Sequence, residues 1–484
     1  MRATCAFGVD IPGAGHIPVM MSPDSISVTE ADSLSILWKR RRRRSLALVR
    51  EVRGIPYLPL LFSPAKDIWW QFHHSGHLCV SNSLPYLDCE LDEVNRGKIT
   101  EKQRTVKILK VKSMQEKERV VFVDYVRVVA PLLVMLVHAS ENFYAADSSG
   151  LAGSASMLAN ESNRFWVAFW DGGVSRCCVP LFMMISAYLL VPMKSGQTMS
   201  SFYKRRFLHI LPPFITFLVA YSLIPLLWGA MDWEQSVADL KSIPWNFTSM
   251  SGILWFMYPL ISLYLIIPIV SPWLEKSKPQ EELCFIALFV ISTFMPFLRR
   301  FVQPELWGEC FWNHFHMLWY CSGYLGYLVL AHYIRVHLTW SVSKRLWVGL
   351  ISFLVGAVFT GWSFWWKGVP GVLMDTPEVE WAWEFCLPNV LLSTFGAFLL
   401  FSCIRQQKAP GWITQISKMS YGMYLMHMLF LAPIASYIVN GDQANPLIPV
   451  WLAIPVIAVI SYVCCVITTK IISLLPGSKW IIGC

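Results

Sequence analysis

Charged residues are scarce in this chain of 484 residues, at 15% of the sequence, whereas an average soluble protein has about 25%. Thirteen cysteines are present, but none form a Cys-x-x-Cys pair, so the spacing indicates neither a zinc ribbon nor a disulfide framework. No apolar segment follows Arg2, and we therefore expect no secretory signal peptide there. So few charges cannot cover the surface of a conventional soluble protein of this length.

Apolar residues dominate instead, at 55% of the chain. They gather in blocks of about 20 residues, the length that a helix needs to cross about 30 Å of hydrocarbon. Many of the 23 tryptophans lie near block ends, as is typical of membrane-interface anchors. We predict an all-α, polytopic membrane protein with about ten transmembrane helices. The predicted spans are 120–139, 174–193, 207–228, 252–273, 283–298, 315–334, 346–366, 383–403, 420–439 and 447–474.

Residues 1–113 contain no apolar stretch long enough to span a membrane, and they include a basic run at 39–44. Such a run can bind anionic lipid headgroups or nucleic acid, or it can lie in a solvated, disordered tail. A further alternative is that the tail is not native and that the chain starts naturally at Met114. We predict a basic, disordered extension over 1–113 and a membrane domain over 114–484. We expect membrane lipids as partners and no nucleic acid.

The connections between the predicted spans alternate in charge. Lysine and arginine gather after spans 2, 6 and 8, as at Lys204–Arg206 and Arg335–Arg345, whereas acidic residues gather in the intervening connections. Because positively charged loops stay in the cytoplasm, both termini are predicted to be cytoplasmic.

The first predicted span holds three ionisable residues, Asp124, Arg127 and His138. At about 100° per residue, the eleven steps from Arg127 to His138 end only about 20° past three full turns, with a rise of about 16.5 Å. The three side chains therefore share one stripe of the helix at different depths. Asp124 and Arg127 are three residues apart and can pair. Alternatives are an interfacial ion pair and a histidine that bonds a neighbouring helix, but ionisable residues inside a membrane favour a functional role.

A basic cluster opens the third span, with Tyr203 followed by Lys204, Arg205 and Arg206. Cations beside a helix start can bind phosphate groups, but they can equally serve only as a topology signal. His314 and His316 lack acidic or cysteine partners at a metal-binding spacing, so no metal site is predicted. Other polar side chains within spans are candidates for substrate contact or for hydrogen bonds between helices. They are Ser186, Trp255, Tyr264, Tyr421, Tyr424 and His427.

Five sequence blocks in order resemble the integral-membrane acyltransferase family 3. The blocks are Asp124-x-x-Arg127 with His138; Pro180-Leu181-Phe182 with Ser186-Ala187-Tyr188; Arg206 with His209 and Pro212; Trp255 with Tyr264 and Pro268; and Ser420-Tyr421 with Tyr424 and His427. The chain departs from the family pattern at Ala187, where glycine is usual, at His209, where arginine is usual, and in lacking a glutamate after Trp255. These departures leave open an inactive member that acts as a scaffold. The fourth block is similar to that of the enterobacterial common antigen O-acetyltransferase branch.

The resemblance implies a multi-pass enzyme of the inner membrane that moves an acetyl or other acyl group from cytoplasmic acetyl-CoA to a hydroxyl of a surface polysaccharide or lipid-linked sugar. It implies His138 as base or nucleophile, because an imidazole can do either near neutral pH. Arg127 is expected to hold the donor, with Asp124 fixing its side chain, while Arg205, Arg206 and Tyr203 are expected to bind the coenzyme. The alternative from another class is a proton-coupled small-molecule transporter.

Overall fold

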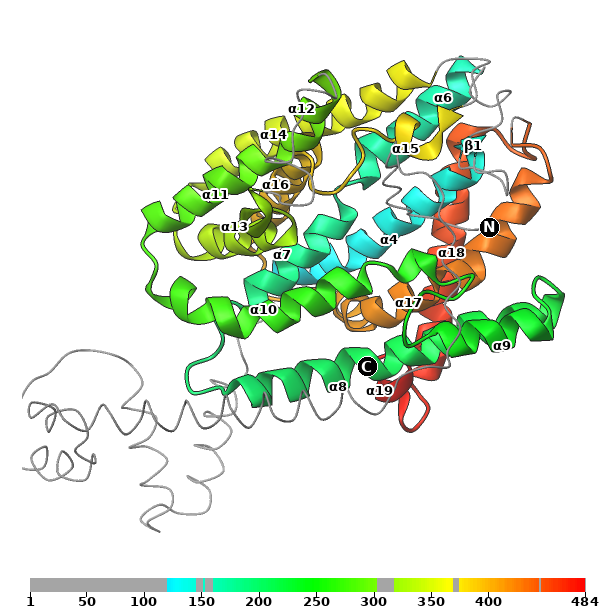
Figure 1. Cartoon of the computed structure of the whole chain (residues 1–484), viewed down its shortest axis with the longest axis horizontal. Coiled ribbons are helices and arrows are strands. Elements are labelled where there is room, and N and C mark those ends of the chain that lie inside the picture. Colours follow the sequence, from blue (N-terminus) through cyan, green and yellow to red (C-terminus); the bar gives the residue numbers. More distant parts are fainter. Residues whose placement is uncertain are drawn as a thin grey trace, which may run out of the picture. The chain divides into compact units, whose positions relative to one another are not determined.

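The computed structural model describes residues 120–144, 151–152, 160–302, 317–368, 374–443 and 445–483. The predicted N-terminal extension lies outside the described residues, and so do His314 and His316. Within them nearly every apolar block forms a helix (Figure 1). The predicted all-α, polytopic membrane fold is confirmed.

Among the described residues, eight helical segments are long and apolar enough to cross a membrane. Two further predicted spans form shorter helices. The spanning segments and the short helices are α4 (Val121–Tyr144), α6 (Glu161–Val167) continued by η2 (Ala168–Ser175) and α7 (Cys178–Leu190), α8 (Met199–Leu223) with η3 (Ile224–Trp228), η4 (Gly252–Leu254) with α10 (Met257–Lys276), α11 (Pro279–Thr293) with α12 (Met295–Phe301), α13 (Tyr324–Val336), α14 (Val342–Lys367), α16 (Pro388–Ser402), α17 (Gly411–Val439) and α18 (Val450–Ile472).

Several short helices and strands lie in the connections between these helices. They are α9 (Trp233–Ser242), η5 (Trp319–Cys321), α15 (Thr376–Val379), α19 (Ser478–Ile481), and the two-residue strands β1 (Leu151–Ala152) and β2 (Met374–Asp375), which pair antiparallel. The strands join the connection after α4 to the connection after α14, so two loops far apart in sequence meet beside the end of α4.

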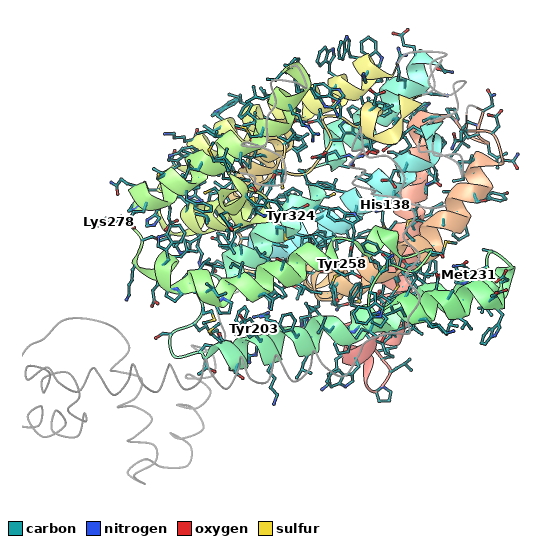
Figure 2. All side chains as sticks on the ribbon, in the orientation of Figure 1. His138, Tyr203, Met231, Tyr258, Lys278 and Tyr324 are labelled. Carbon is teal, nitrogen blue, oxygen red and sulfur yellow. The ribbon has the colours of Figure 1, made fainter. Side chains whose placement is uncertain are left out.

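Helix α4 is the centre of the bundle, and it packs against α7, α17 and α18. Its residues are apolar on nearly all sides, which is the pattern of a helix enclosed by other helices, and its apolar window is the most buried among the candidate spans. The peripheral helices α14 and α18 instead expose large apolar side chains, such as Val358, Ile351 and Ile471, as helices facing lipid do. Figure 2 shows His138 within the bundle and Lys278 at its edge.

The second spanning segment changes from an α-helix to the π-helix η2 and back. A π-helical turn alters which residues face a neighbour and is often found at functional sites. Gly172 makes the close approach to α14 possible, because a Cβ at this position would lie 2.9 Å from the Gly361 Cα and from the Trp383 ring. The segment thereby turns Asp171 and Arg176 into the bundle, where both are buried.

Candidate active site

His138 lies near the end of α4 and is 9% exposed. Its Nδ1 lies 2.7 Å from Glu141 Oε2, one turn further along the same helix. Since an ionised carboxylate can only accept, Nδ1 is the donor in this pair, and in a neutral ring Nε2 then keeps its lone pair. Glu141 therefore orients an imidazole whose free nitrogen is a base, in the manner of the acid–histidine pair of hydrolytic triads.

His427 of α17 stacks on His138, with ring centroids 5.2 Å apart and planes inclined by 28°. Its Nδ1 donates to the Tyr424 carbonyl oxygen at 2.5 Å, which leaves Nε2 as the acceptor of the neutral ring. Among the described residues, His427 Nε2 and the Tyr424 hydroxyl are buried without a hydrogen-bond partner. Buried polar atoms usually have partners, so these two atoms mark a place where a polar ligand can bind.

A buried network of charges adjoins this pair of histidines. Arg176 Nε lies 2.8 Å from Asp171 Oδ1, and Arg176 Nη2 lies 3.5 Å from Glu380 Oε1. The Tyr144 hydroxyl, at the end of α4, lies 3.0 Å from Asp171 and 2.6 Å from Glu380. The guanidinium of Arg176 also lies 4.3 Å from the centroid of the Trp383 ring, a favourable cation–π geometry. Three elements, α4, η2 and the connection after α14, are thus held together by one cation.

Glu380 and Glu384 have different surroundings although they are neighbours in sequence. Burial raises the pKa of the Glu380 carboxyl, and Arg176 opposes that rise. Glu384, four residues further along, is exposed. Glu380 is therefore the acid that joins the site.

The remaining residues of the predicted stripe follow the same interior face of α4. Asp124 is 2% exposed, and the Ser417 hydroxyl of α17 donates to its Oδ1 at 2.7 Å. Arg127 is half-buried and lies within electrostatic range of His209 on α8 and Tyr264 on α10. Asp124 and His138 are both buried inside the bundle, whereas Arg127 is half-buried and joins a second polar region.

That second region brings together side chains from four helices. Ser186 of α7 and Arg206 of α8 both lie close enough to Tyr264 of α10 to interact with its hydroxyl. Arg206 is half-buried, with a buried Nε that has no hydrogen-bond partner among the described residues, whereas Arg205 is exposed. Such half-buried and exposed cations are suited to bind phosphate groups.

Two of the predicted polar residues mainly fasten helices. The Tyr203 hydroxyl donates to the Leu265 carbonyl oxygen at 2.8 Å, and the Tyr421 hydroxyl donates to the Ile210 carbonyl oxygen at 2.6 Å. Both bonds hold α8 against neighbouring helices. Trp255 stacks on Phe385 at 5.5 Å and so packs against the connection that carries Glu380.

The family comparison agrees with this arrangement. The acyltransferase domain family matches residues 120–470, which is well over half of the chain and includes both polar regions. The chain belongs to acyltransferase family 3. This membrane acyltransferase has no match among the curated proteins or the solved structures.

The structure brings into this region side chains that the sequence analysis did not propose for the site. Glu141, Asp171, Arg176 and Glu380 were not proposed as site residues from the sequence. A signal existed for Glu141, because it lies three residues after His138 and α4 continues to Tyr144, beyond the predicted end at 139. No sequence spacing links Glu380 to Arg176, since the two residues meet only when the connection after α14 folds back.

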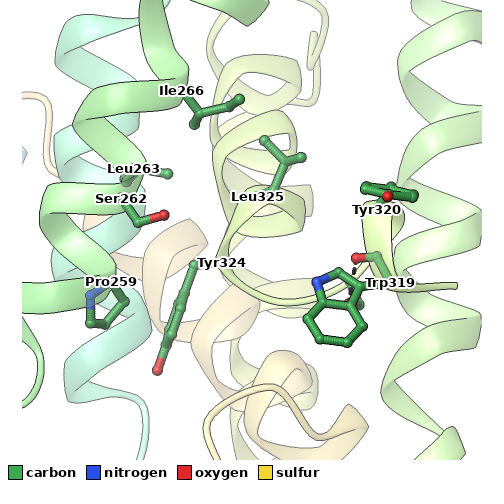
Figure 3. Close-up of a pocket in the computed structure, with 9 residues that line it drawn as sticks. Pro259, Ser262, Leu263, Ile266, Trp319, Tyr320, Tyr324 and Leu325 are labelled. Carbon is green, nitrogen blue, oxygen red and sulfur yellow. Dashed lines mark hydrogen bonds between the residues drawn. The ribbon is translucent and has the colours of Figure 1, made fainter. Parts of the chain in front are cut away.

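A hollow of about 300 Å³ lies between α10 and the start of α13 (Figure 3). It is lined by Pro259, Ser262, Leu263, Ile266, Trp319, Tyr320, Ser322, Tyr324 and Leu325. The lining contains no carboxylate, imidazole or cation, and its ionisable groups are two tyrosine hydroxyls, which stay protonated near neutral pH. His138 and its partners therefore remain the candidate active site.

Proposed function

We propose that this membrane acyltransferase moves an acetyl group from acetyl-CoA to a hydroxyl of a cell-surface polysaccharide or lipid-linked sugar. The observation that carries the proposal is the His138–Glu141 pair, with its Nδ1–Oε2 distance of 2.7 Å, beside the unpartnered buried atoms of His427 and Tyr424. An oriented imidazole base can activate a hydroxyl, and nearby buried polar atoms without partners can bind the substrate.

In the proposed reaction, His138 Nε2 removes the proton of the sugar hydroxyl as the oxygen attacks the thioester carbonyl. The new C–O bond forms, the C–S bond breaks, and the proton passes to the departing thiolate to give the free thiol. Glu141 stabilises the imidazolium that exists between these two proton transfers. Arg127 offsets negative charge on the donor, and Asp124 supports the position of Arg127.

The donor is proposed to enter through the basic cluster of α8. Arg205 and Arg206 attract the phosphates of the coenzyme, and Tyr203 fixes α8 through its bond to Leu265 at 2.8 Å. We propose an inner-membrane location with both termini in the cytoplasm, because the basic connections then face the pool of acetyl-CoA. The resemblance of the fourth sequence block makes enterobacterial common antigen the first acceptor to test.

The decisive experiment incubates proteoliposomes that contain the purified protein with labelled acetyl-CoA and candidate glycans. We expect label in covalent linkage to a sugar hydroxyl, identified by mass spectrometry of the glycan. Liposomes without protein and liposomes with the His138→Ala variant are the controls. Accumulation of a small molecule in the lumen without transfer to sugar contradicts the proposal and favours a transporter.

The Arg205→Ala/Arg206→Ala double variant is expected to raise the KM for acetyl-CoA by about 10-fold or more, because charge-assisted hydrogen bonds contribute about 1.5–3 kcal/mol each. The kcat is expected to change much less. The matched control is Lys418→Ala, which removes an exposed cation at the start of α17. An unchanged KM together with lost membrane insertion would assign the two arginines a purely topological role.

A further inference from the structure

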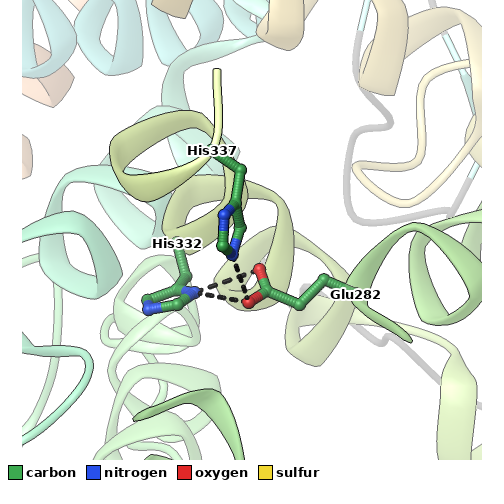
Figure 4. A group of neighbouring side chains, drawn as sticks. All are labelled: Glu282, His332 and His337. Carbon is green, nitrogen blue, oxygen red and sulfur yellow. Dashed lines mark hydrogen bonds and ion pairs between the residues drawn. The ribbon is translucent and has the colours of Figure 1, made fainter. Parts of the chain in front are cut away.

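Three side chains outside the acyl-transfer site converge on one point between α11 and α13 (Figure 4). Glu282, in the first turn of α11, is fully buried, and His332, near the end of α13, is 2% exposed. His332 Nδ1 lies 3.0 Å from Glu282 Oε2, and His337 Nε2 lies 3.1 Å from Glu282 Oε1. One nitrogen from each histidine and one carboxylate oxygen all lie within 4.8 Å of one another.

The surrounding structure holds two of these groups, Glu282 and His337, in place. The Ser277 hydroxyl donates to Glu282 Oε1 at 2.6 Å. His337 caps α13, with its backbone N–H bonded to the Tyr333 carbonyl oxygen at 2.8 Å and its ring 5.5 Å from the Tyr333 ring. Oriented ligands with supporting hydrogen bonds are characteristic of metal sites.

Arg335 belongs to the same turn of α13 but has other partners. Its Nη1 donates to the Tyr188 and Val191 carbonyl oxygens at 2.7 and 3.2 Å, at the end of α7. The carboxylate of Glu282 is therefore matched by two imidazoles and a hydroxyl, and a cation held between the imidazoles and the carboxylate would compensate its buried charge.

We propose that Glu282, His332 and His337 bind a Zn²⁺ ion, through one carboxylate oxygen, His332 Nδ1 and His337 Nε2. Two imidazoles and one carboxylate suit zinc, whereas Mg²⁺ and Ca²⁺ prefer sites made entirely of oxygen ligands. Three protein ligands leave a fourth position for water. The His337 side chain is 17% exposed, which gives the ion a route to the site.

The ion fastens the start of α11 to the end of α13, since its ligands come from both helices. The cluster shares no residue with the His138 network, so the inference stands apart from the proposed acyl transfer. The sequence analysis predicted no metal site. It could not find this cluster, because Glu282 and His332 are 50 residues apart and no short spacing relates them.

The test uses the full-length protein, purified in detergent without a metal-affinity step and stripped with a chelator. Zinc affinity is then measured by titration in competition with a chromophoric chelator, and the amount of bound metal is measured by elemental mass spectrometry. We expect one Zn²⁺ per chain, with affinity lowered about 100-fold or more in Glu282→Gln and in His332→Gln, because even outer partners of a ligand alter affinity by 10–100-fold. Zinc should also raise the thermal unfolding midpoint of the wild-type protein and leave that of the two ligand variants unchanged.

Glu281→Gln is the matched control, because Glu281 is the neighbouring carboxylate on the same turn and accepts only from the Lys278 backbone N–H at 3.2 Å among the bonds of the described residues. This variant should bind zinc as the wild type does. If Glu282→Gln and His332→Gln fail to fold, His337→Gln, which changes a partly exposed ligand, is tested in their place. Absence of stoichiometric zinc in the wild type, or equal zinc affinity in the wild type and the ligand variants, overturns the proposal.

Discussion

Acyl transfer by the His138→Ala variant is expected to fall by about 10²- to 10⁴-fold, the range that general acid–base catalysis contributes. The variant removes the nitrogen that faces away from Glu141 and, with it, the acceptor for the hydroxyl proton. It should still insert and accumulate, because the side chain lies inside an apolar bundle and leaves a small cavity. The measurement is the initial rate of label transfer from acetyl-CoA to the glycan at equal amounts of folded protein.

Two variants on the same helix sharpen this experiment. Ser140→Ala is the control, since its buried hydroxyl bonds only within α4, to the Leu136 carbonyl oxygen at 2.8 Å, and we expect its rate to stay within a few-fold of the wild type. Glu141→Gln should lower kcat with little change in KM, because it weakens the orientation of His138 and the stabilisation of the imidazolium. Wild-type transfer by His138→Ala would remove the catalytic assignment.

Arg176→Met is expected to destabilise the folded protein by about 3–5 kcal/mol, the usual effect of removing one partner from a buried ion pair. The substitution leaves the fully buried Asp171 carboxylate without its cation, and it also removes the contact with Glu380 and the stacking on Trp383. The measurement is the thermal unfolding midpoint in detergent, together with the fraction of protein that elutes as a folded species.

The double variant Asp171→Leu/Arg176→Met tests the cause of this loss. Apolar residues of similar volume can replace a buried ion pair without loss of stability, so we expect the double variant to recover much of the stability that Arg176→Met loses. Arg405→Met, at an exposed arginine, is the control and should change stability by no more than about 0.5 kcal/mol. Equal stability of Arg176→Met and the wild type would show that the network contributes little.

The sequence predicted the membrane architecture closely, because the length of an apolar block reports the thickness of the bilayer directly. Each of the ten predicted spans coincides with a helix among the described residues, although α13 and α16 have only 13 and 15 residues. The predicted helix ends were less accurate than the predicted spans. The first span was predicted to end at 139, whereas α4 continues to Tyr144, since polar residues at a helix end give no clear hydropathy signal.

Part of the candidate site was also accessible from the sequence. The interior stripe of α4 follows from helical geometry alone, because residues eleven apart on one helix share a face. The stacking of His427 on His138 could not be predicted from the sequence. The two residues are almost 290 positions apart, and neither spacing nor hydropathy relates α17 to α4.

By itself the sequence determined that this chain is a bundle of membrane helices whose first helix carries an acid, a guanidinium and an imidazole on one side. These are local properties of a single segment. Only the tertiary structure decided that His427 stacks on His138, that Arg176 joins Asp171 to Glu380, and that Glu282 meets His332 and His337. Such contacts depend on which helices pack together and on how their ends turn, and a charge buried in a membrane protein acquires its role from the partner that it meets there.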